Sequence, residues 1–183
     1  MMQIDLPIFP IIETERLILR RLVMDDTPAI FAMRSNPEIM RYIPVSLSQT
    51  TDDAQAYISS IDQRMASKEC INWAITLKEN DVMIGTIGIF RIALDHYRGE
   101  VGYTTLSEFN GKGYVTEALT TIVDYGFNAL KFHSLGALVD PDNIGSVRVL
   151  EKCGFEKEGH IRDNWFFEGK FIDTAIYSKL NKK

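Results

Sequence analysis

The chain has little cysteine and no excess of positive charge. Its 183 residues include two cysteines, Cys70 and Cys153, which form no CxxC motif and have no histidine cluster near them. This pattern favours reduced thiols and argues against a disulfide framework or a metal site. The formal net charge of −5 excludes a nucleic-acid binder that relies on a broad basic surface. We therefore expect no metal and no direct nucleic-acid partner.

Long hydrophobic runs are also missing. No apolar run approaches the roughly 20 residues that span a bilayer. Residues 1–17 show no basic stretch before an apolar run and no small-residue cleavage site, so we expect no signal peptide. Repeats and linker-like stretches are absent too. The sequence therefore predicts a cytoplasmic protein without a membrane partner, in which residues 1–183 form a single domain.

The hydrophobic pattern predicts a mixed α/β sheet. Alternating or continuous apolar stretches indicate strands at 16–22, 71–78, 82–92, 99–106, 135–139, 154–166 and 170–180. Helical spacing of apolar residues indicates helices at 24–36, 48–67, 114–130 and 144–152. The resulting order is β-α-α-β-β-β-α-β-α-β-β, which is typical of an α/β domain.

Turn and cap residues set several boundaries. Asp25 or Asp26 is expected to cap the first helix, and Asn143 or Asp142 the last. Gly154 is placed to end the last helix in the left-handed conformation, and Glu168-Gly169 joins the two final strands. Gly102 interrupts a strand and indicates either a bulge or a close backbone approach.

The stretch "EFNGKGYVTEAL" places Gly111 and Gly113 directly before a helix. It fails the Walker A pattern, because Leu106 and Gly113 stand where that pattern needs Gly and Ser or Thr. It also fails the dinucleotide pattern, because Thr116 stands where a glycine is needed. What remains is a glycine-rich turn whose free amides and positive helix end would suit a phosphate or pyrophosphate. A capped strand-to-helix turn without a ligand also fits these residues.

Four segments together resemble one family. They are "ETERLILRRL", "GEVGYTTLSEFNGKGYVTEAL", "VDPDNIGSVRVLEKCGF" and "EGKFIDTAIYSKL", and they span nearly the whole chain in this order. The chain resembles the GNAT superfamily of acyl-CoA-dependent N-acetyltransferases, and within it the RimJ/RimL type that acetylates ribosomal-protein N-termini. The resemblance implies the GNAT fold, a mixed and mostly antiparallel sheet flanked by helices. The family's phosphate-loop pattern keeps Gly113 here but departs at Asn110 and Val115.

The resemblance implies acetyl-CoA as the acetyl donor and gives its binding residues. The strand at 101–103 would pair with the pantetheine arm and then diverge from the strand that ends at Val139, opening a cleft for the thioester. An amide at the bulge would stabilise the tetrahedral oxyanion. The implied acetyl-CoA-binding residues are Val101, Gly102, Tyr103, Gly111, Lys112, Gly113, Tyr114, Val115, Thr116, Asn143 and Ser146.

Ser146 and Glu100 are the catalytic candidates. The resemblance implies that Ser146 hydrogen-bonds the leaving sulfur and that Asn143 contacts pantetheine; alternatively, Asn143 only caps the helix and Ser146 bonds only backbone or water. Glu100, on the strand that would bind the cofactor, is the candidate base, or else an ordinary exposed acid. Glu117 is a weaker candidate, because an acid in the first turn of a helix serves the helix dipole.

The remaining candidates also have purely structural interpretations. Residues 96 and 97 could line the substrate mouth or form a solvated loop. Cys153 is interpreted as a small core residue, because no base is positioned to activate it. The position that matches the glutamate base of RimL-like enzymes is Trp165, which would make the acceptor pocket more apolar or would simply pack.

These features predict transfer of an acetyl group from acetyl-CoA to a primary amine. The preferred acceptor is a protein N-terminal α-amine, such as that of a basic ribosomal protein, and the enzyme is expected to be a monomer or homodimer. Two alternatives stay open: acetylation of a small amine such as an antibiotic or polyamine, and a non-catalytic acyl-CoA-binding sensor module.

Overall fold

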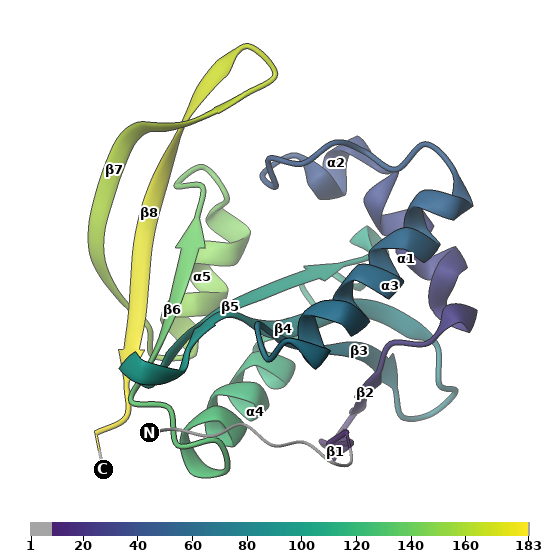
Figure 1. Ribbon diagram of the computed structural model, residues 1–183, viewed down its shortest axis with the longest axis horizontal. Helices are drawn as coiled ribbons and strands as arrows, with labels where there is room; N and C mark the ends of the chain where they lie inside the picture. The colour runs from purple at the N-terminus through teal and green to yellow at the C-terminus, as the bar shows by residue number, and fades with distance from the viewer. Residues whose placement is uncertain (1–8, 183) are drawn as a thin grey trace.

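Eight strands form one sheet in the order β1-β2-β3-β4-β5-β6-β8-β7. The computed structural model describes residues 9–182. Residues 1–8 and residue 183 lie outside the described residues. The expectation that residues 1–17 form no signal peptide therefore falls partly outside them. Neighbouring strands pair antiparallel except β5 and β6, which pair parallel. The predicted mixed, mostly antiparallel sheet is confirmed (Figure 1).

The elements follow the predicted order with two additions. The strands are β1 (Ile12–Glu13), β2 (Leu17–Arg21), β3 (Ile71–Leu77), β4 (Met83–Ala93), β5 (Arg98–Thr105), β6 (Ser134–Val139), β7 (Glu156–Phe167) and β8 (Lys170–Leu180). The helices are α1 (Thr27–Arg34), α2 (Pro37–Met40), α3 (Thr51–Ala66), α4 (Tyr114–Asn128) and α5 (Ile144–Lys152). Single 3-10 turns lie at Met24–Asp26, Leu94–His96 and Ser107–Phe109.

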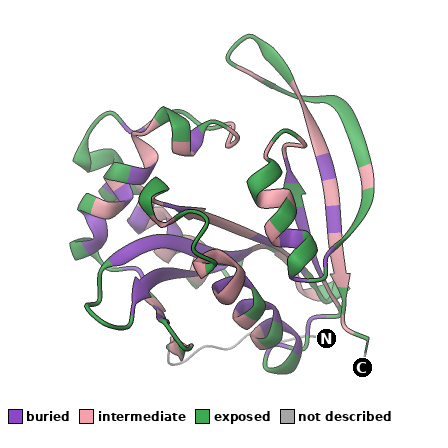
Figure 2. Cartoon of the chain, turned by 180° about the vertical axis from the view of Figure 1, so that it is seen from behind, coloured by how far each residue is buried: buried purple, intermediate pink, exposed green. Residues whose placement is uncertain are grey.

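Helices cover the two faces of the sheet with separate cores. Leu119 and Ile122 of α4 are fully buried in the larger cluster, together with inward-facing residues of β2 to β6. Ile30 of α1 and Ile58 of α3 bury their side chains in the smaller cluster against β3 and β4. Helical spacing places these residues on one face of each helix. Figure 2 shows that burial concentrates in the central strands, whereas β7 is largely exposed and β8 is mostly half-buried.

Several local signals are confirmed. The Asn143 side chain accepts a hydrogen bond from the Ser146 amide at 3.0 Å and caps α5. Gly154 has φ +78° after α5, and Glu168 and Gly169 have φ +45° and +80° in the turn between β7 and β8. Short-range backbone chemistry decides these positions, and so they are readable from the sequence.

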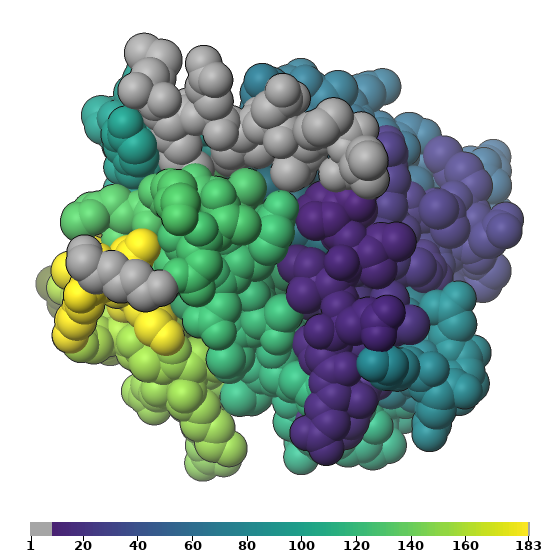
Figure 3. All heavy atoms as spheres, turned by 90° about the horizontal axis from the view of Figure 1, so that it is seen from below, coloured from purple at the N-terminus to yellow at the C-terminus, as the bar shows by residue number. Residues whose placement is uncertain are grey.

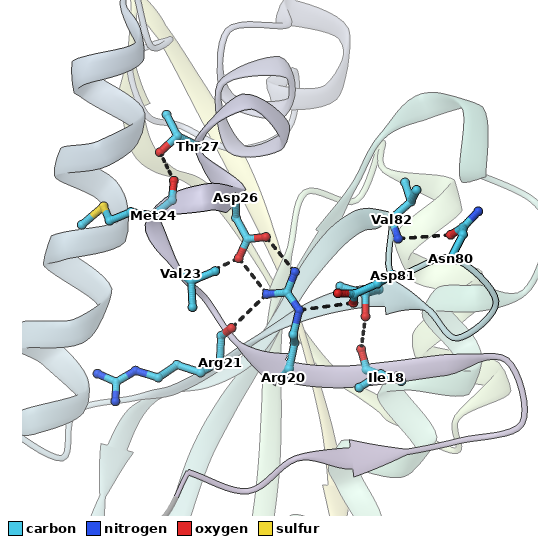
Figure 4. A network of polar contacts seen from close by, with 11 residues as sticks. Ile18, Arg20, Arg21, Val23, Met24, Asp26, Thr27, Asn80, Asp81 and Val82 are labelled. Carbon is cyan, nitrogen blue, oxygen red and sulfur yellow. Dashed lines mark hydrogen bonds and ion pairs between the residues drawn. The ribbon is translucent and has the colours of Figure 1, made fainter.

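The expected cap of the first helix is wrong in its chemistry. Asp26 precedes α1, but its side chain does not cap the helix. Its carboxylate instead accepts hydrogen bonds from Arg20 at 2.8 and 2.9 Å and from the Val23 amide at 2.9 Å, as Figure 4 shows. A guanidinium from β2 competes successfully for this carboxylate because its planar donors bind both oxygens. The result fastens the start of α1 to β2.

Two short elements were not expected, and the alternatives at Gly102 are decided by the structure. The short strand β1 and helix α2 were not predicted; α2 begins at an Asn36 cap, whose side chain accepts from the Glu38 amide at 2.9 Å. At Gly102 the register with β4 is continuous, and the bulge lies in β4 between Phe90 and Ala93. A Cβ on Gly102 would lie 3.2 Å from the Phe90 ring, so this glycine marks a close approach and not a bulge.

Candidate active site

β5 and β6 begin as a parallel pair and then diverge. They pair at Arg98 with Ser134, Gly99 with Leu135 and Glu100 with Gly136, and no further pair follows within the described residues. Beyond these positions β5 continues toward Thr105 and β6 toward Val139 in different directions (Figure 1). Residues 101–103 therefore present one backbone edge without a strand partner, as pairing with a pantetheine arm requires.

The glycine-rich loop leads into the N-terminus of α4. Gly111 and Gly113 have φ +74° and +83°, a region that other residues rarely adopt, so the turn itself requires both glycines. A Cβ built on Gly111 would meet nothing within 4 Å, and one on Gly113 would meet an Arg16 terminal nitrogen at 3.4 Å. The loop is therefore open where the first amides of α4 emerge. Val115 and Thr116 lie in the first turn of that helix.

Asn110 and Lys112 make contacts within this loop region. The Asn110 side-chain oxygen accepts a hydrogen bond from the Thr105 hydroxyl at 2.7 Å, which joins the loop to the end of β5. The Lys112 ammonium lies over the Phe109 ring at 5.2 Å. At the motif position where Asn110 stands, the family carries a longer side chain; the structure uses Asn110 to hold the loop in place.

Glu117 anchors the same loop from inside α4. Its carboxylate accepts from Thr14 at 2.6 Å, from the Arg16 amide at 2.9 Å and from the Arg16 guanidinium at 2.7 Å. Burial alone would raise the pKa of Glu117, but the hydrogen bonds from Thr14 and Arg16 outweigh it and hold the pKa below its ordinary value. A carboxylate with three hydrogen bonds suits a role in holding the loop, not a role as a base. Figure 3 shows the purple β1–β2 segment lying against the teal and green of α4.

Arg16 completes this anchor. Its guanidinium donates to the Lys112 carbonyl at 3.1 Å and lies 4.6 Å from the centre of the Tyr114 ring. The N-terminal part of the chain thus supports both sides of the glycine-rich turn. The sequence signal was present in "ETERL", but its partner Glu117 is too distant in the chain to be paired with it by inspection.

Ser146 and Tyr103 face one another across the divergence of the strands. The Tyr103 hydroxyl lies 2.8 Å from Ser146 Oγ and donates to the Ser146 carbonyl at 3.2 Å. Burial raises the pKa of Tyr103 to about 12, although the hydrogen bond with Ser146 opposes the shift. The phenol therefore keeps its proton at neutral pH. The structure brings together the predicted site residues 103, 143 and 146, on β5 and at the start of α5.

Glu100 lies on the other face of β5. Alternation along a strand places Glu100 and Tyr103 on opposite faces. Glu100 is 19% exposed, lies 2.6 Å from Arg91 and 4.0 Å from Arg98, and lines a small cavity of about 150 Å³. The structure does not bring Glu100 to the face that holds Ser146, and its role as a base stays a prediction.

The remaining candidates make contacts with other parts of the chain. Tyr97 adopts φ +52°, and its carbonyl accepts from the His133 amide at 2.7 Å, so this loop braces the segment before β6. Cys153 is buried, its sulfur lies 3.7 Å from the Thr116 carbonyl oxygen, and burial raises the pKa of its thiol. Trp165 pairs with Ile172 on the hairpin and is 48% exposed.

A larger cavity of about 630 Å³ lies among three segments distant in the sequence. They are α2 with the loop after it, the β6–α5 loop, and the end of the β7–β8 hairpin. Sequence reasoning missed this cavity, because no local pattern shows that these segments meet. Its lining residues are Pro37, Met40, Arg41, Tyr42, Ile43, Val45, Leu47, Asp140, Pro141, Asp142, Phe167, Glu168, Lys170, Phe171, Ile172 and Asp173.

Comparison with protein families assigns the chain to a known family. A model of the acetyltransferase (GNAT) domain matches residues 16–156 of the chain. The chain belongs to the GNAT acetyltransferase family. It is accordingly an N-acetyltransferase of the GNAT type.

Individual GNAT relatives align over almost the whole chain. The uncharacterized N-acetyltransferase YoaA of Bacillus subtilis is 39% identical over 170 residues, which cover 93% of this chain and 96% of the relative. A spermidine N(1)-acetyltransferase of Vibrio cholerae is 26% identical and covers 92% of this chain and 95% of its own.

Solved GNAT structures share the fold. The ribosomal-protein-S5-alanine acetyltransferase of Vibrio fischeri has a TM-score of 0.83 at 24% identity, covering 95% of this chain and 98% of that one. The spermidine N-acetyltransferase of Vibrio cholerae, solved with CoA and spermine, has a TM-score of 0.82 at 24% identity, covering 93% and 98%. At this level of identity the likeness shows a shared fold.

The described residues lack two further features, a cluster of metal-binding side chains and a membrane-spanning helix. Among residues 9–182, no group of three or more His, Cys, Asp or Glu side chains is arranged to hold a metal ion. Within the same part of the GNAT chain, no helix has the length and apolar character to cross a bilayer.

Proposed function

We propose that this GNAT enzyme transfers the acetyl group of acetyl-CoA to the α-amino group of a protein N-terminus. The observation that carries the proposal is the placement of a helix N-terminus, a free strand edge and a partly buried hydroxyl around one divergence of the sheet. Amides of residues 111–116 would hold the pyrophosphate, residues 101–103 and Asn143 would hold pantetheine, and Ser146 would contact the sulfur.

The proposed reaction needs no covalent enzyme intermediate. The neutral amine attacks the thioester carbon, the C–S bond breaks, and the thiolate leaves with the electron pair while the amine loses a proton to a base or to water. Holding the amine beside the thioester supplies much of the acceleration. The Ser146 hydroxyl would stabilise the negative charge that develops on sulfur.

The larger cavity is the proposed acceptor site. Its lining combines apolar side chains, among them Tyr42 and Phe171, with the carboxylates of Asp140 and Asp142 next to the start of α5. The apolar part suits the first side chain of a peptide, and the carboxylates suit its amine. The exposed rings of Phe166 and Phe171, with centroids 5.0 Å apart, extend the apolar surface along the hairpin.

An α-amine is also the easier nucleophile. Its pKa of about 7.7–8.0 leaves roughly a tenth neutral at pH 7, whereas a lysine amine near 10.4 requires about 2.5 units, or roughly 3.4 kcal/mol, more from the site. The net charge of −5 favours a basic protein partner by steering that salt weakens.

Spermidine is the second candidate acceptor. The observations in its favour are the Vibrio cholerae spermidine N(1)-acetyltransferase among the relatives and the four carboxylates around the cavity, Asp140, Asp142, Glu168 and Asp173. A polyamine would place its charges against these acids.

The test is CoA release with a panel of acceptors at saturating acetyl-CoA. The panel holds a lysine-free peptide with a free N-terminus, an N-blocked peptide with lysine, spermidine and an aminoglycoside. We expect the free N-terminus to react fastest. Faster turnover of spermidine or of the blocked peptide would replace this proposal, and acetyl-CoA binding without CoA release from any amine would indicate a sensor module.

A further inference from the structure

The Tyr103 side chain makes a contact in the site beyond the backbone pairing with pantetheine. Its ring extends from β5 toward α5, and its hydroxyl ends 2.8 Å from Ser146 Oγ. Both partners of this contact are partly buried. The contact joins the two sides of the divergence at the hydroxyl that is proposed to face the leaving sulfur.

We propose that Tyr103 is a positioning residue, whose phenol donates to Ser146 Oγ and so directs the Ser146 proton toward the leaving thiolate. This inference rests on the proposed role of Ser146 in the acetyl-transfer site. It concerns the donor half of the reaction and is independent of the identity of the amine.

The hydrogen-bond inventory supports this direction. A serine hydroxyl has one proton and two lone pairs, and a thiolate offers only lone pairs. When the sulfur becomes negative, the Ser146 proton must point to it, which leaves Oγ free to accept from Tyr103. The single phenolic proton then turns from the Ser146 carbonyl, 3.2 Å away, to Oγ at 2.8 Å. Donation into Oγ polarises the hydroxyl and strengthens its own bond to sulfur.

The protonation of Tyr103 supports the same direction. Burial raises the pKa of this phenol to about 12, so it remains a donor throughout the neutral range. No proton leaves Tyr103 in this arrangement. The C–S electron pair passes to sulfur, and both hydroxyls stabilise that charge by hydrogen bonding alone.

The first test is a double-mutant cycle on steady-state acetyl transfer with the best acceptor. Tyr103→Phe keeps the ring and should lower kcat about fivefold to tenfold, the value of one hydrogen bond, with the KM for acetyl-CoA changed less than about twofold. In a Ser146→Ala background the same substitution should cause no further loss. Tyr125→Phe is the matched control, because the Tyr125 ring packs against Trp73 in the core; it should leave kcat unchanged.

The second test needs no acceptor, so a failure of the proposed α-amine acceptor would not obscure it. The thiol of enzyme-bound CoA is titrated by the ultraviolet absorbance of its thiolate. Its pKa should be higher by up to about one unit in Tyr103→Phe than in the wild type, a tenfold change in the thiolate equilibrium. A fluorinated tyrosine at position 103 keeps the shape and is a stronger donor, so it should lower that pKa below the wild-type value.

Three results would overturn the proposal. Multiplicative losses in the cycle would show that Tyr103 acts independently of Ser146. Loss of CoA binding in Tyr103→Phe, with circular dichroism unchanged, would make Tyr103 a binding residue. An unchanged thiol pKa in both Tyr103 variants would show that the contact serves only the fold.

Discussion

The donor side and the acceptor side of this enzyme are built differently. The donor side uses backbone amides at the start of α4, a free edge of β5 and the Asn143 cap of α5. The contact of Arg16 with Glu117 fixes the loop that leads into α4. The acceptor cavity is bounded by side chains from three separate segments. Backbone groups can serve one invariant ligand, whereas side chains on loops set specificity. We therefore expect substitutions on one side to leave the other side's binding intact.

Gly113→Glu should have the largest effect and is confined to the donor side. The substitution places a negative charge where the pyrophosphate is proposed to bind, and acetyl-CoA affinity should fall more than about 100-fold. Because φ is +83° at this position, any side chain also costs about 1–2 kcal/mol of backbone strain. Gly113→Ala is the control, since it carries the strain without the charge and should retain most of the affinity. Calorimetry on folded variants decides; equal affinities for Glu and Ala would refute phosphate binding at this loop.

Ser146→Ala tests whether the donor side stabilises the leaving group. The loss should fall on kcat, by up to about 100-fold, and less on the KM for acetyl-CoA, because the hydrogen bond strengthens in the transition state. Ser60→Ala is the control: Ser60 lies on α3 and donates to the Tyr57 carbonyl at 2.7 Å. A wild-type kcat in Ser146→Ala would leave Ser146 with a structural role only.

Glu117→Gln tests the anchor that holds the donor loop. The folded pKa of Glu117 is below its ordinary value of about 4.3, so its contribution to stability is present above that value and is lost as pH falls through the folded pKa. The variant should lose about 1–2 kcal/mol of unfolding free energy at neutral pH, and the difference should shrink below about pH 4. Denaturant unfolding across pH, with exposed Glu79→Gln as control, checks this. A difference that is constant with pH would argue against the role of this carboxylate.

Phe171→Ala should have the smallest effect and is confined to the acceptor side. Phe171 lines the cavity, and its removal should raise the acceptor KM about threefold to tenfold through lost apolar contact. The affinity for acetyl-CoA should be unchanged. Ile161→Ala is the control, since Ile161 is an exposed apolar residue of the same hairpin that does not line the cavity. Equal effects of the two substitutions, or a weaker acetyl-CoA affinity, would break the separation of the two sides.

The same contrast explains what the sequence could predict. The caps at Asn143 and Gly154 and the turn at 168–169 follow from short-range backbone rules, and each was predicted correctly. The family motifs predicted roles for the loop at 111–116 and for Ser146, because the residues within each motif are close together in the chain.

Long-range pairings escaped prediction. Asp25 or Asp26 was expected to cap α1, but Asp26 binds Arg20 instead. The Arg91 partner of Glu100 and the Arg16 partner of Glu117 come from other parts of the chain. The acceptor cavity could not be predicted for the same reason, since α2, the β6–α5 loop and the hairpin meet only in the folded chain. The pattern at Gly102 left a bulge and a close approach open, and only the folded chain shows that this glycine lies close to the Phe90 ring.

The most direct measurement uses one peptide that carries both a free N-terminus and an internal lysine. The peptide is incubated with the enzyme and acetyl-CoA, and tandem mass spectrometry locates the acetyl group. The account predicts acetylation at the α-amine, with lysine modified only after long incubation. Acetyl groups that appear first on the lysine side chain would contradict it.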